Sequence, residues 1–209
     1  MKNIAGIFAI SEAVIYLIAF VIYGLVLQFP SGDATQTISF LQQNYRLLSV
    51  MNLMMYVLFG GLLSVLVLAI YQYTQLLSPN LSQIAAVFGL LWVALVIATG
   101  MIANIALTTV TNMSDAEQAL ETWRTIGIIT EGLGGGNEVV GGLWVLLLTL
   151  ATYQDKRFPK FLFLLGLLVG FAGICTMYPL ALFTEIFGLS QIIWFIAIGV
   201  FLIRLKPLT

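Results

Sequence analysis

Six apolar stretches, each long enough to cross a membrane, constrain this chain more than any other feature of its sequence. The hydrocarbon core of a bilayer is about 30 Å thick, and a helix needs about 20 apolar residues to cross it. Stretches that meet this requirement run over residues 4–27, 47–71, 84–110, 126–153, 161–183 and 187–205. We therefore predict one all-α integral membrane domain over residues 1–209, built as a bundle of six transmembrane helices.

Composition supports the membrane class and argues against a nucleic-acid partner. Hydrophobic residues make up 61% of the chain and charged residues 8%, with a mean hydropathy of +1.06. These values lie far outside the range of soluble globular proteins. The net charge is −1 and no long basic run is present, so we expect membrane lipids as partners and no nucleic acid.

The distribution of basic residues between the two ends of the spans predicts the orientation. With six spans, both termini lie on one side of the membrane. That side holds Lys2, Lys156, Arg157, Lys160, Arg204 and Lys206, and the opposite side holds Arg46 and Arg124. Because cytoplasmic loops are enriched in lysine and arginine, we predict that both termini are cytoplasmic.

Two loops on the predicted outer side carry helical patterns of their own. The segment "SDAE" at residues 114–117 fits a capping box, and apolar residues follow it at helical spacing up to Trp123. Residues 38–48 show a similar apolar stripe. We expect short helices in the outer interface, which either anchor the spans or form a lid over an outward-facing cavity.

Three acidic residues, Glu12, Glu131 and Glu138, fall within predicted spans. A charged side chain near the bilayer centre costs ~3 kcal/mol or more, so none of them is expected to face lipid as an anion. Glu131 and Glu138 are seven residues apart and project from one side of a continuous helix, about 10 Å apart, with Arg124 seven residues earlier. Glu12 and Glu138 have no obvious counter-charge, so we expect them to be protonated, hydrated or holding a cation.

Other polar residues add to this set. Asn52, Asn104 and Gln191 fall in the outer halves of their spans, as Glu131 does, and they line one outward-facing pocket if they converge. The alternative is that they form interhelical hydrogen bonds, worth ~1 kcal/mol each. The candidate ligand-binding residues are Glu138, Glu131, Asn137, Glu12, Asn104, Asn52, Gln191 and Arg124.

Glycines flank the two central acids, at positions 127, 132, 134, 135, 136, 141 and 142. Small residues let neighbouring helices approach closely, and this is one interpretation of the cluster. The other is that the "GLGGG" segment unwinds and offers backbone groups to a ligand, as broken helices do in transporters. Either interpretation predicts that residues 132–136 depart from regular helix or pack directly against another helix.

The chain contains no histidine, which excludes several kinds of chemistry. The usual haem ligand, the commonest zinc ligand and the usual partner of a serine or cysteine nucleophile are all missing. Each lysine lies near the end of a predicted span, so no lysine is placed for a Schiff base deep in the membrane. We expect no metal site and no cofactor.

Three segments resemble a known family. "GGGNEVVGGLWVLLL", "FPKFLFLLGLLVGFAGI" and "IFGLSQIIWFIAIGVFLI" are similar to the corresponding segments of small six-helix bacterial membrane proteins that are described only as a domain of unknown function. The resemblance implies a multi-pass protein of the bacterial cytoplasmic membrane. It implies no substrate and no catalytic residue.

These observations leave three functional hypotheses. The leading one is a non-enzymatic protein that binds or carries a small or lipophilic molecule, or a cation, near Glu138 and Glu131. The second is an intramembrane enzyme in which a protonated Glu12 or Glu138 acts as a general acid on an apolar, isoprenoid-like substrate. The third is a structural or regulatory subunit, and pairing with a second copy or with another membrane protein is compatible with all three.

Overall fold

The chain is all-helical in the computed structural model, which describes residues 2–30, 32–178 and 180–205. The described residues form nine α-helices and three π-helical turns. The α-helices are α1 (Lys2–Val21), α2 (Ala34–Gln43), α3 (Tyr45–Asn52), α4 (Phe59–Thr74), α5 (Pro79–Thr111), α6 (Ala116–Thr130), α7 (Val139–Ala151), α8 (Lys160–Cys175) and α9 (Ala181–Arg204). The π-helical turns are Ile22–Val26, Leu53–Leu58 and Glu131–Gly135. The predicted all-α class is confirmed, and Lys206 lies outside the described residues.

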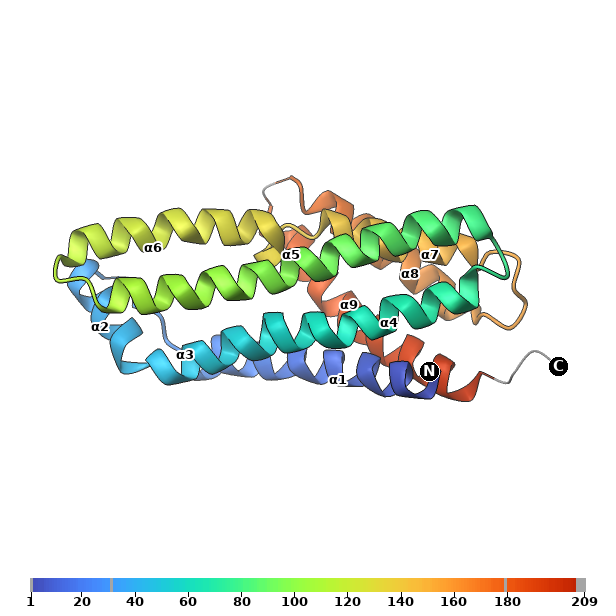
Figure 1. The fold of residues 1–209 in the computed structure, drawn as a ribbon, viewed down its shortest axis with the longest axis horizontal. Coiled ribbons are helices and arrows are strands. Elements are labelled where there is room, and N and C mark those ends of the chain that lie inside the picture. The colour runs from blue at the N-terminus through green and yellow to red at the C-terminus, as the bar shows by residue number, and fades with distance from the viewer. Residues whose placement is uncertain (1, 31, 179, 206–209) are drawn as a thin grey trace.

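Six helices form a closed ring, which we call the bundle. Around the ring α1 packs against α4, α4 against α5, α5 against α7, α7 against α8, α8 against α9, and α9 against α1. Only the first part of α5 takes part in it (Figure 1). The chain termini, the α4–α5 loop and the α7–α8 loop lie at the same end of the bundle (Figure 1). Consecutive helices of the ring therefore alternate in direction.

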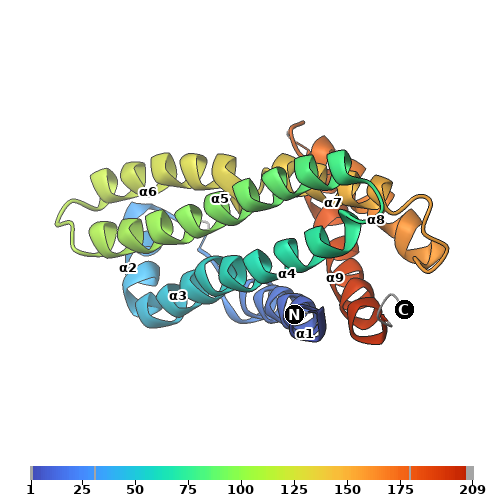
Figure 2. The ribbon, with the colours of Figure 1, turned by 45° about the vertical axis from the view of Figure 1, so that its right-hand side comes forward.

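The remaining helices extend from the other end of the bundle as an arm, formed by α2, α3, the second part of α5, and α6. Helix α6 lies alongside α5, and α2 packs against both of them (Figure 2). A separate apolar cluster holds the arm together, with Leu41, Leu107 and Ala119 fully buried in it. The arm thus has its own small core.

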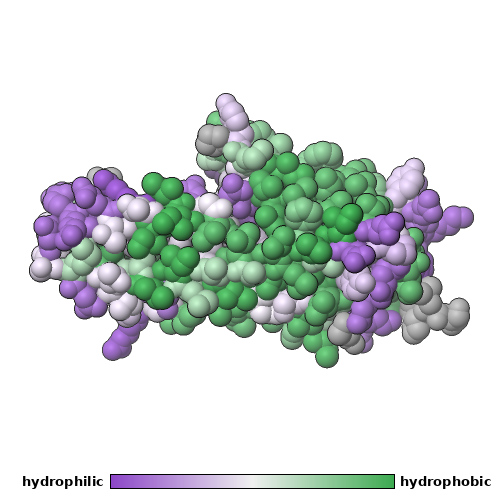
Figure 3. All heavy atoms as spheres, turned by 45° about the horizontal axis from the view of Figure 1, so that its top comes forward, coloured by the Kyte–Doolittle hydropathy of each residue, from purple (hydrophilic) through white to green (hydrophobic). Residues whose placement is uncertain are grey.

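Five helical segments are long and apolar enough to cross a membrane. They are Lys2–Val26, Tyr45–Thr74, Pro79–Thr111, Ala116–Ala151 and Ala181–Arg204. Large apolar side chains such as Leu25, Phe161 and Leu164 are exposed around the bundle, which is the expected surface of a helix bundle in lipid. Figure 3 shows this apolar surface over the middle of the molecule, with polar residues gathered at the two ends. The chain therefore has the architecture of a multi-pass membrane protein.

Helix boundaries differ clearly from three of the predicted spans. The stretch 126–153 is not one α-helix, since α6 ends at Thr130 and α7 begins at Val139. The stretch 161–183 ends as a helix at Cys175, and the last helix begins at Ala181 rather than near residue 187. Thr176 ends α8 by donating its hydroxyl to the Gly173 carbonyl, 2.7 Å away. Tyr178 precedes a proline in the sequence, and the residue before a proline disfavours the helical region.

The expected short helix at residues 114–123 is not a separate element. Asp115 caps α6, since its carboxylate accepts hydrogen bonds from the backbone N–H groups of Glu117 and Gln118 at 3.0 and 3.2 Å. The helix then continues without interruption to Thr130, because Ala119 and Leu120 are buried on one face. Helix α2 is a separate short helix at residues 34–43.

Close backbone approach explains several of the glycines. A Cβ atom added at Gly142 would lie 2.8 Å from the carbonyl oxygen of Gly170 and from the backbone of Gly173, so α7 and α8 touch through their main chains. At Gly141 a Cβ atom would lie 2.6 Å from the ring of Trp92. Glycine at these two positions lets α7 pack against α8 on one side and α5 on the other.

Candidate functional site

The chain between α6 and α7 is broken, and this break builds the site. The π-helical turn Glu131–Gly135 contains Gly134 with φ of 134°, a backbone conformation that glycine adopts and other residues rarely do. Residues 136–138 then run outside regular helix, and α7 begins at Val139. Of the two alternatives predicted for residues 132–136, a departure from regular helix or direct packing against another helix, the structure shows the first. The expected continuous stripe of Arg124, Glu131 and Glu138 along one helix is wrong, because the chain turns at Gly134.

Glu138 stands at the start of α7, and two neighbouring helices hold it there. Its backbone N–H donates to the Thr176 hydroxyl, 2.8 Å away at the end of α8. Its side-chain oxygen Oε2 accepts a hydrogen bond from the indole Nε1 of Trp92 on α5, at 3.0 Å. The residue is only 8% exposed. The break therefore places a buried residue whose backbone is held by α8 and whose carboxyl group is held by α5.

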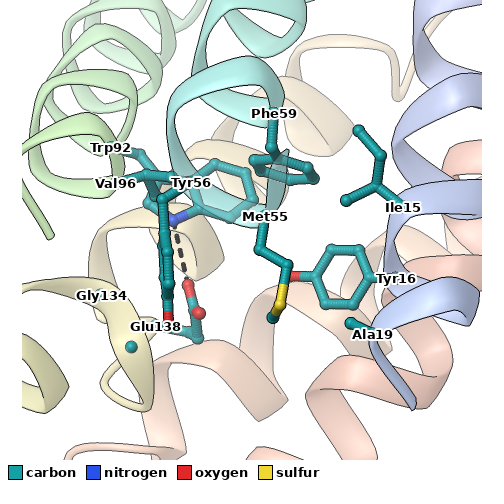
Figure 4. Close-up of a pocket in the computed structure, with 11 residues that line it drawn as sticks. Ile15, Tyr16, Ala19, Met55, Tyr56, Phe59, Trp92, Val96, Gly134 and Glu138 are labelled. Atoms are coloured by element: carbon teal, nitrogen blue, oxygen red, sulfur yellow. Dashed lines mark hydrogen bonds between the residues drawn. The ribbon is translucent and has the colours of Figure 1, made fainter. Parts of the chain in front are cut away.

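A cavity of about 90 Å³ lies against this carboxyl group. Its walls come from α1, α4, α5, the π-helical turn Leu53–Leu58 and the break, so residues far apart in the sequence meet around it (Figure 4). They are Ile15, Tyr16, Ala19, Met55, Tyr56, Phe59, Trp92, Val96, Gly134, Gly135 and Glu138. Two of the three π-helical turns contribute to this wall, and π-bulges inside helices occur frequently at functional sites.

Four of the eleven residues that line the cavity are aromatic. Phe59 contacts Tyr16 and Trp92 edge to face, with ring centroids 5.5 and 6.0 Å apart. In Figure 4, Tyr56 and Trp92 flank the Glu138 carboxyl group, and Tyr16 approaches from α1 on the other side of the cavity. Behind this layer, Trp144 and Trp194 are fully buried. The rings are held by packing, which gives the cavity a fixed shape.

A second, more open pocket of about 460 Å³ lies on the other side of Tyr56 and Gly135, since these two residues line both spaces. This pocket contains Glu131 from the break and Glu185 from α9, and both residues are exposed. The Thr184 hydroxyl donates to the Gly136 carbonyl at 3.4 Å and closes one side of it. Glu131 and Glu138 thus lie in adjacent but separate spaces.

Glu12 and Gln191 are buried in the bundle, on the adjacent helices α1 and α9, and both are 0% exposed. Within the described ranges, the two carboxyl oxygens of Glu12 have no hydrogen-bond partner. The same holds for the amide oxygen and nitrogen of Gln191. Glu12 lies one helical turn before Tyr16, which lines the cavity. Glu12 does not line the cavity itself.

The other predicted residues do not join the cavity. Asn137 accepts a hydrogen bond from the Val139 N–H at 3.3 Å and supports the first turn of α7. Asn52 is buried at the end of α3, and Asn104 is half-buried on α5. Arg124 is exposed on α6. Of the eight candidates, only Glu138 lines the cavity and only Glu131 lines the neighbouring pocket, so they do not form one shared site.

Sequence reasoning missed the aromatic partners of Glu138. In the sequence, Trp92 and Tyr56 look like ordinary apolar residues of their spans. Trp92 is 46 residues from Glu138, so nothing in the local pattern connects the two. Tyr16 carried a weak signal, since it follows Glu12 by one turn. Glu185 falls between the predicted spans 161–183 and 187–205, where an acidic residue does not indicate a site. In the structure α9 begins at Ala181, so Glu185 belongs to that helix.

The ion pair that the structure describes lies in the α7–α8 loop, at the end of the bundle away from the arm. In the part of the chain that the structure describes, the one ion pair joins Arg157 to Asp155 at 2.9 Å, in the α7–α8 loop. The Tyr73 hydroxyl also donates to Asp155. Hydrogen bonds from Arg157 lower the pKa of the Asp155 carboxyl to about 2. Across the described residues no group of three or more His, Cys, Asp or Glu is placed to hold a metal ion.

Comparison with known proteins identifies the family but no activity. A family model described as a domain of unknown function (DUF4386) matches residues 4–205, so the chain belongs to this family. No curated protein and no solved structure matches the sequence.

Proposed function

We propose that this member of the DUF4386 family binds or carries a small ligand, in the first place a cation, at Glu138 within the membrane. One observation carries the proposal: a buried carboxyl group opens on a cavity at a helix break, with no basic residue paired to it in the described ranges. Purely structural packing does not need a carboxyl group there, because glutamine would accept the same Trp92 hydrogen bond without the cost of a buried negative charge.

The broken helix supports a binding role. Irregular backbone at membrane depth is tolerated where it is buried in protein or lines a cavity, and transporters use such breaks to form substrate sites near the middle of the membrane. Here the break supplies Gly134, Gly135 and Glu138 to one cavity. A neutral Glu138 can donate a hydrogen bond, and a deprotonated one can accept a cation, which is the alternation that a proton-coupled carrier requires.

The size of the cavity favours this function over the enzymatic alternative. An engineered protein cavity of about 150 Å³ holds benzene. At about 90 Å³, the space beside Glu138 suits a ligand no larger than benzene and is too small to enclose an isoprenoid chain. The subunit hypothesis makes a different demand, since it requires that Glu138 be replaceable by glutamine without consequence.

The proposal includes a topology. We place six crossings in the membrane, with the 16-residue α8 as the fifth, because α8 packs between α7 and α9 in the ring. The termini, Lys156, Arg157 and Lys160 then face the cytoplasm of a bacterial inner membrane, and the tip of the arm, at the α5–α6 loop, lies outside.

Cysteine labelling tests this orientation. Ser114 lies in the α5–α6 loop at the tip of the arm and is exposed. A membrane-impermeant thiol reagent added to intact spheroplasts should label Ser114→Cys in a background where Cys175 is replaced by serine. Labelling that appears only after the inner face is opened would reverse the topology.

Infrared difference spectroscopy across pH 4 to 9 tests the function itself. Reconstituted wild type should show a carboxyl band that disappears in Glu138→Gln and that responds to pH and to added cations. The variant should remain folded, because glutamine keeps an acceptor for the Trp92 indole. A Glu138 band that ignores both pH and cations, together with a fully stable variant, would leave only a packing role for this residue.

A further inference from the structure

The cavity wall restricts the chemical class of cation that fits beside Glu138. Four rings, those of Tyr16, Tyr56, Phe59 and Trp92, line the cavity together with the thioether of Met55 and the one carboxyl group of Glu138. Inorganic cations such as Na⁺, Ca²⁺ and Mg²⁺ require several oxygen ligands around them. One Glu138 oxygen already accepts from Trp92, and no cluster of metal-ligating side chains occurs among the described residues.

Aromatic faces recognise a different type of cation. An ammonium group within about 6 Å of a ring centroid is attracted by the ring quadrupole, and alkylated ammonium ions also gain from contact between their methyl groups and the rings. The rings here are too tightly packed to move aside freely, as the edge-to-face contacts of Phe59 with Tyr16 and Trp92 show. A cavity lined by aromatic rings and one carboxylate provides both interactions that bind such an ion: attraction to the rings and attraction to a negative charge.

The neighbouring pocket adds two acidic residues next to the cavity. Glu131 and Glu185 place two exposed carboxylates on one side of Tyr56 and Gly135, and Glu138 lies on the other side. Clefts lined with one sign of charge concentrate ions of the opposite sign and accelerate their association. An anion would be repelled in the open pocket and again at the buried carboxylate.

From these observations we infer that the cavity binds a small organic ammonium ion of about five heavy atoms, which reaches it from the Glu131–Glu185 pocket past Tyr56. The inference rests on the proposed function and narrows its ligand. The ammonium charge lies against the free oxygen of Glu138, and the methyl or methylene groups contact the rings of Tyr16, Tyr56 and Trp92. The volume of about 90 Å³ sets the size limit.

Binding measurements with matched probes test the ligand class. Wild-type protein in lipid nanodiscs is titrated with tetramethylammonium, methylammonium, K⁺, Na⁺ and tert-butanol, followed by tryptophan fluorescence and isothermal calorimetry. Tetramethylammonium and tert-butanol each have five heavy atoms and differ in charge. We expect saturable binding of tetramethylammonium, weaker binding of methylammonium, and no saturation with K⁺, Na⁺ or tert-butanol.

Variants assign the binding to this cavity. Glu138→Gln should weaken tetramethylammonium binding roughly 30-fold or more, because it removes the one charge opposite the ion. Tyr56→Leu should weaken it roughly 5- to 30-fold, and Tyr56→Phe much less, because phenylalanine keeps the ring. Matched controls are Glu117→Gln on the arm and Tyr153→Leu in the α7–α8 loop, both at exposed positions, which should bind like the wild type.

The outcomes separate the inference from the proposed function. Glu138-dependent binding of K⁺ or Na⁺ without tetramethylammonium binding overturns the organic-cation inference and leaves the proposed function standing. Equal binding of tert-butanol and tetramethylammonium also overturns the inference. If no probe binds and the Glu138 carboxyl band is indifferent to pH, both fail. If a variant does not fold, the wild-type titrations still decide between these results.

Discussion

The bundle and the arm are stabilised by different means, although α5 runs through both. Helices of the bundle approach through glycines, and three fully buried tryptophans pack edge to face or tilted at its centre, with Trp144 5.7 Å from Trp92 and 5.6 Å from Trp194. The arm has a small aliphatic cluster and interhelical polar contacts, such as the Tyr45 hydroxyl at 2.9 Å from the Thr108 hydroxyl.

Helix ends show the same contrast. Among the described helices, the two with a side-chain cap at the N-terminus are α2 and α6, capped by Asp33 and Asp115, and both belong to the arm. Helices α7, α8 and α9 of the bundle begin without one. Side-chain caps satisfy backbone groups at helix ends as they do in soluble proteins. The N-termini of α2 and α6 are therefore satisfied by side chains as in soluble proteins, while α7, α8 and α9 begin without such caps.

The largest effect should come from the closest backbone contact of the bundle. Gly142→Leu would place a side chain where α7 meets the main chain of Gly170 and Gly173. We expect a loss of about 3 kcal/mol or more, or no folded protein, because backbone atoms cannot move aside. Gly127→Leu on α6 is the matched control, since nothing lies within 4 Å of its added Cβ. Thermal unfolding in detergent compares them, and equal melting of the two would refute the close-contact argument.

A smaller effect is expected at the junction of bundle and arm. Gly134→Ala has room for its methyl group, because the nearest atom would be Val96 Cγ2 at 3.7 Å. The backbone conformation with φ of 134° should nevertheless cost about 1–3 kcal/mol. Gly132→Ala is the control, since no atom lies within 4 Å there and its φ is not in the left-handed region. If Gly134→Ala melts like Gly132→Ala, the chain does not turn at Gly134.

Removal of a cap should affect the arm alone. Asp115→Ala leaves the N–H groups of Glu117 and Gln118 without their side-chain acceptor and should cost about 1 kcal/mol. Hydrogen exchange should accelerate in the first turns of α6 and stay unchanged in α7 and α8. Glu121→Ala, an exposed substitution on the same helix, should leave both regions unchanged. Faster exchange in α7 as well would mean that arm and bundle unfold as one unit.

The smallest effect concerns pH at the opposite end of the bundle. Because Arg157 lowers the pKa of Asp155 to about 2, below the ~3.9 of an unfolded chain, this carboxyl favours the folded state above about pH 4. That contribution is lost as pH falls from about 4 towards 2, and it should not exceed about 1 kcal/mol for a pair beside water. Asp155→Asn should remove this part of the acid dependence. If the stability of Asp155→Asn falls with pH as it does in the wild type, the Asp155–Arg157 pair does not contribute to the acid dependence.

Hydropathy alone predicted the all-helical, multi-pass membrane class, because this needs only helix length and apolar composition. The boundaries around α6 and α8 depended on local contacts, such as the Asp115 cap and the Thr176 hydroxyl, which a hydropathy pattern does not record. For the site, the cost of burying a charge singled out Glu138 correctly as a buried carboxyl. The sequence did not predict that Glu138 and Glu131 lie in separate pockets. That depends on which glycine of "GLGGG" turns the chain, and tertiary packing decides which one does.

The partners of Glu138 were beyond sequence reasoning for a similar reason. Trp92 and Tyr56 lie on other helices, and a single sequence contains no information about which side of one helix faces which side of another. Glu12 and Gln191 show the opposite case. Their burial in the bundle was expected from their position in apolar stretches, and their lack of hydrogen-bond partners in the described ranges became visible only with the fold.

Helix α5 is uninterrupted over 33 residues, about 50 Å at the usual rise of 1.5 Å per residue. One rigid rod therefore joins the indole that holds Glu138 to the tip of the arm, about 28 Å further along. A tilt of about 10° around Trp92 would displace Thr111 by roughly 5 Å, because a rigid rod converts a small angle into a displacement that grows with distance from the pivot. A pair of distance probes on the arm would therefore register a small tilt of α5 without any change to the residues that line the cavity.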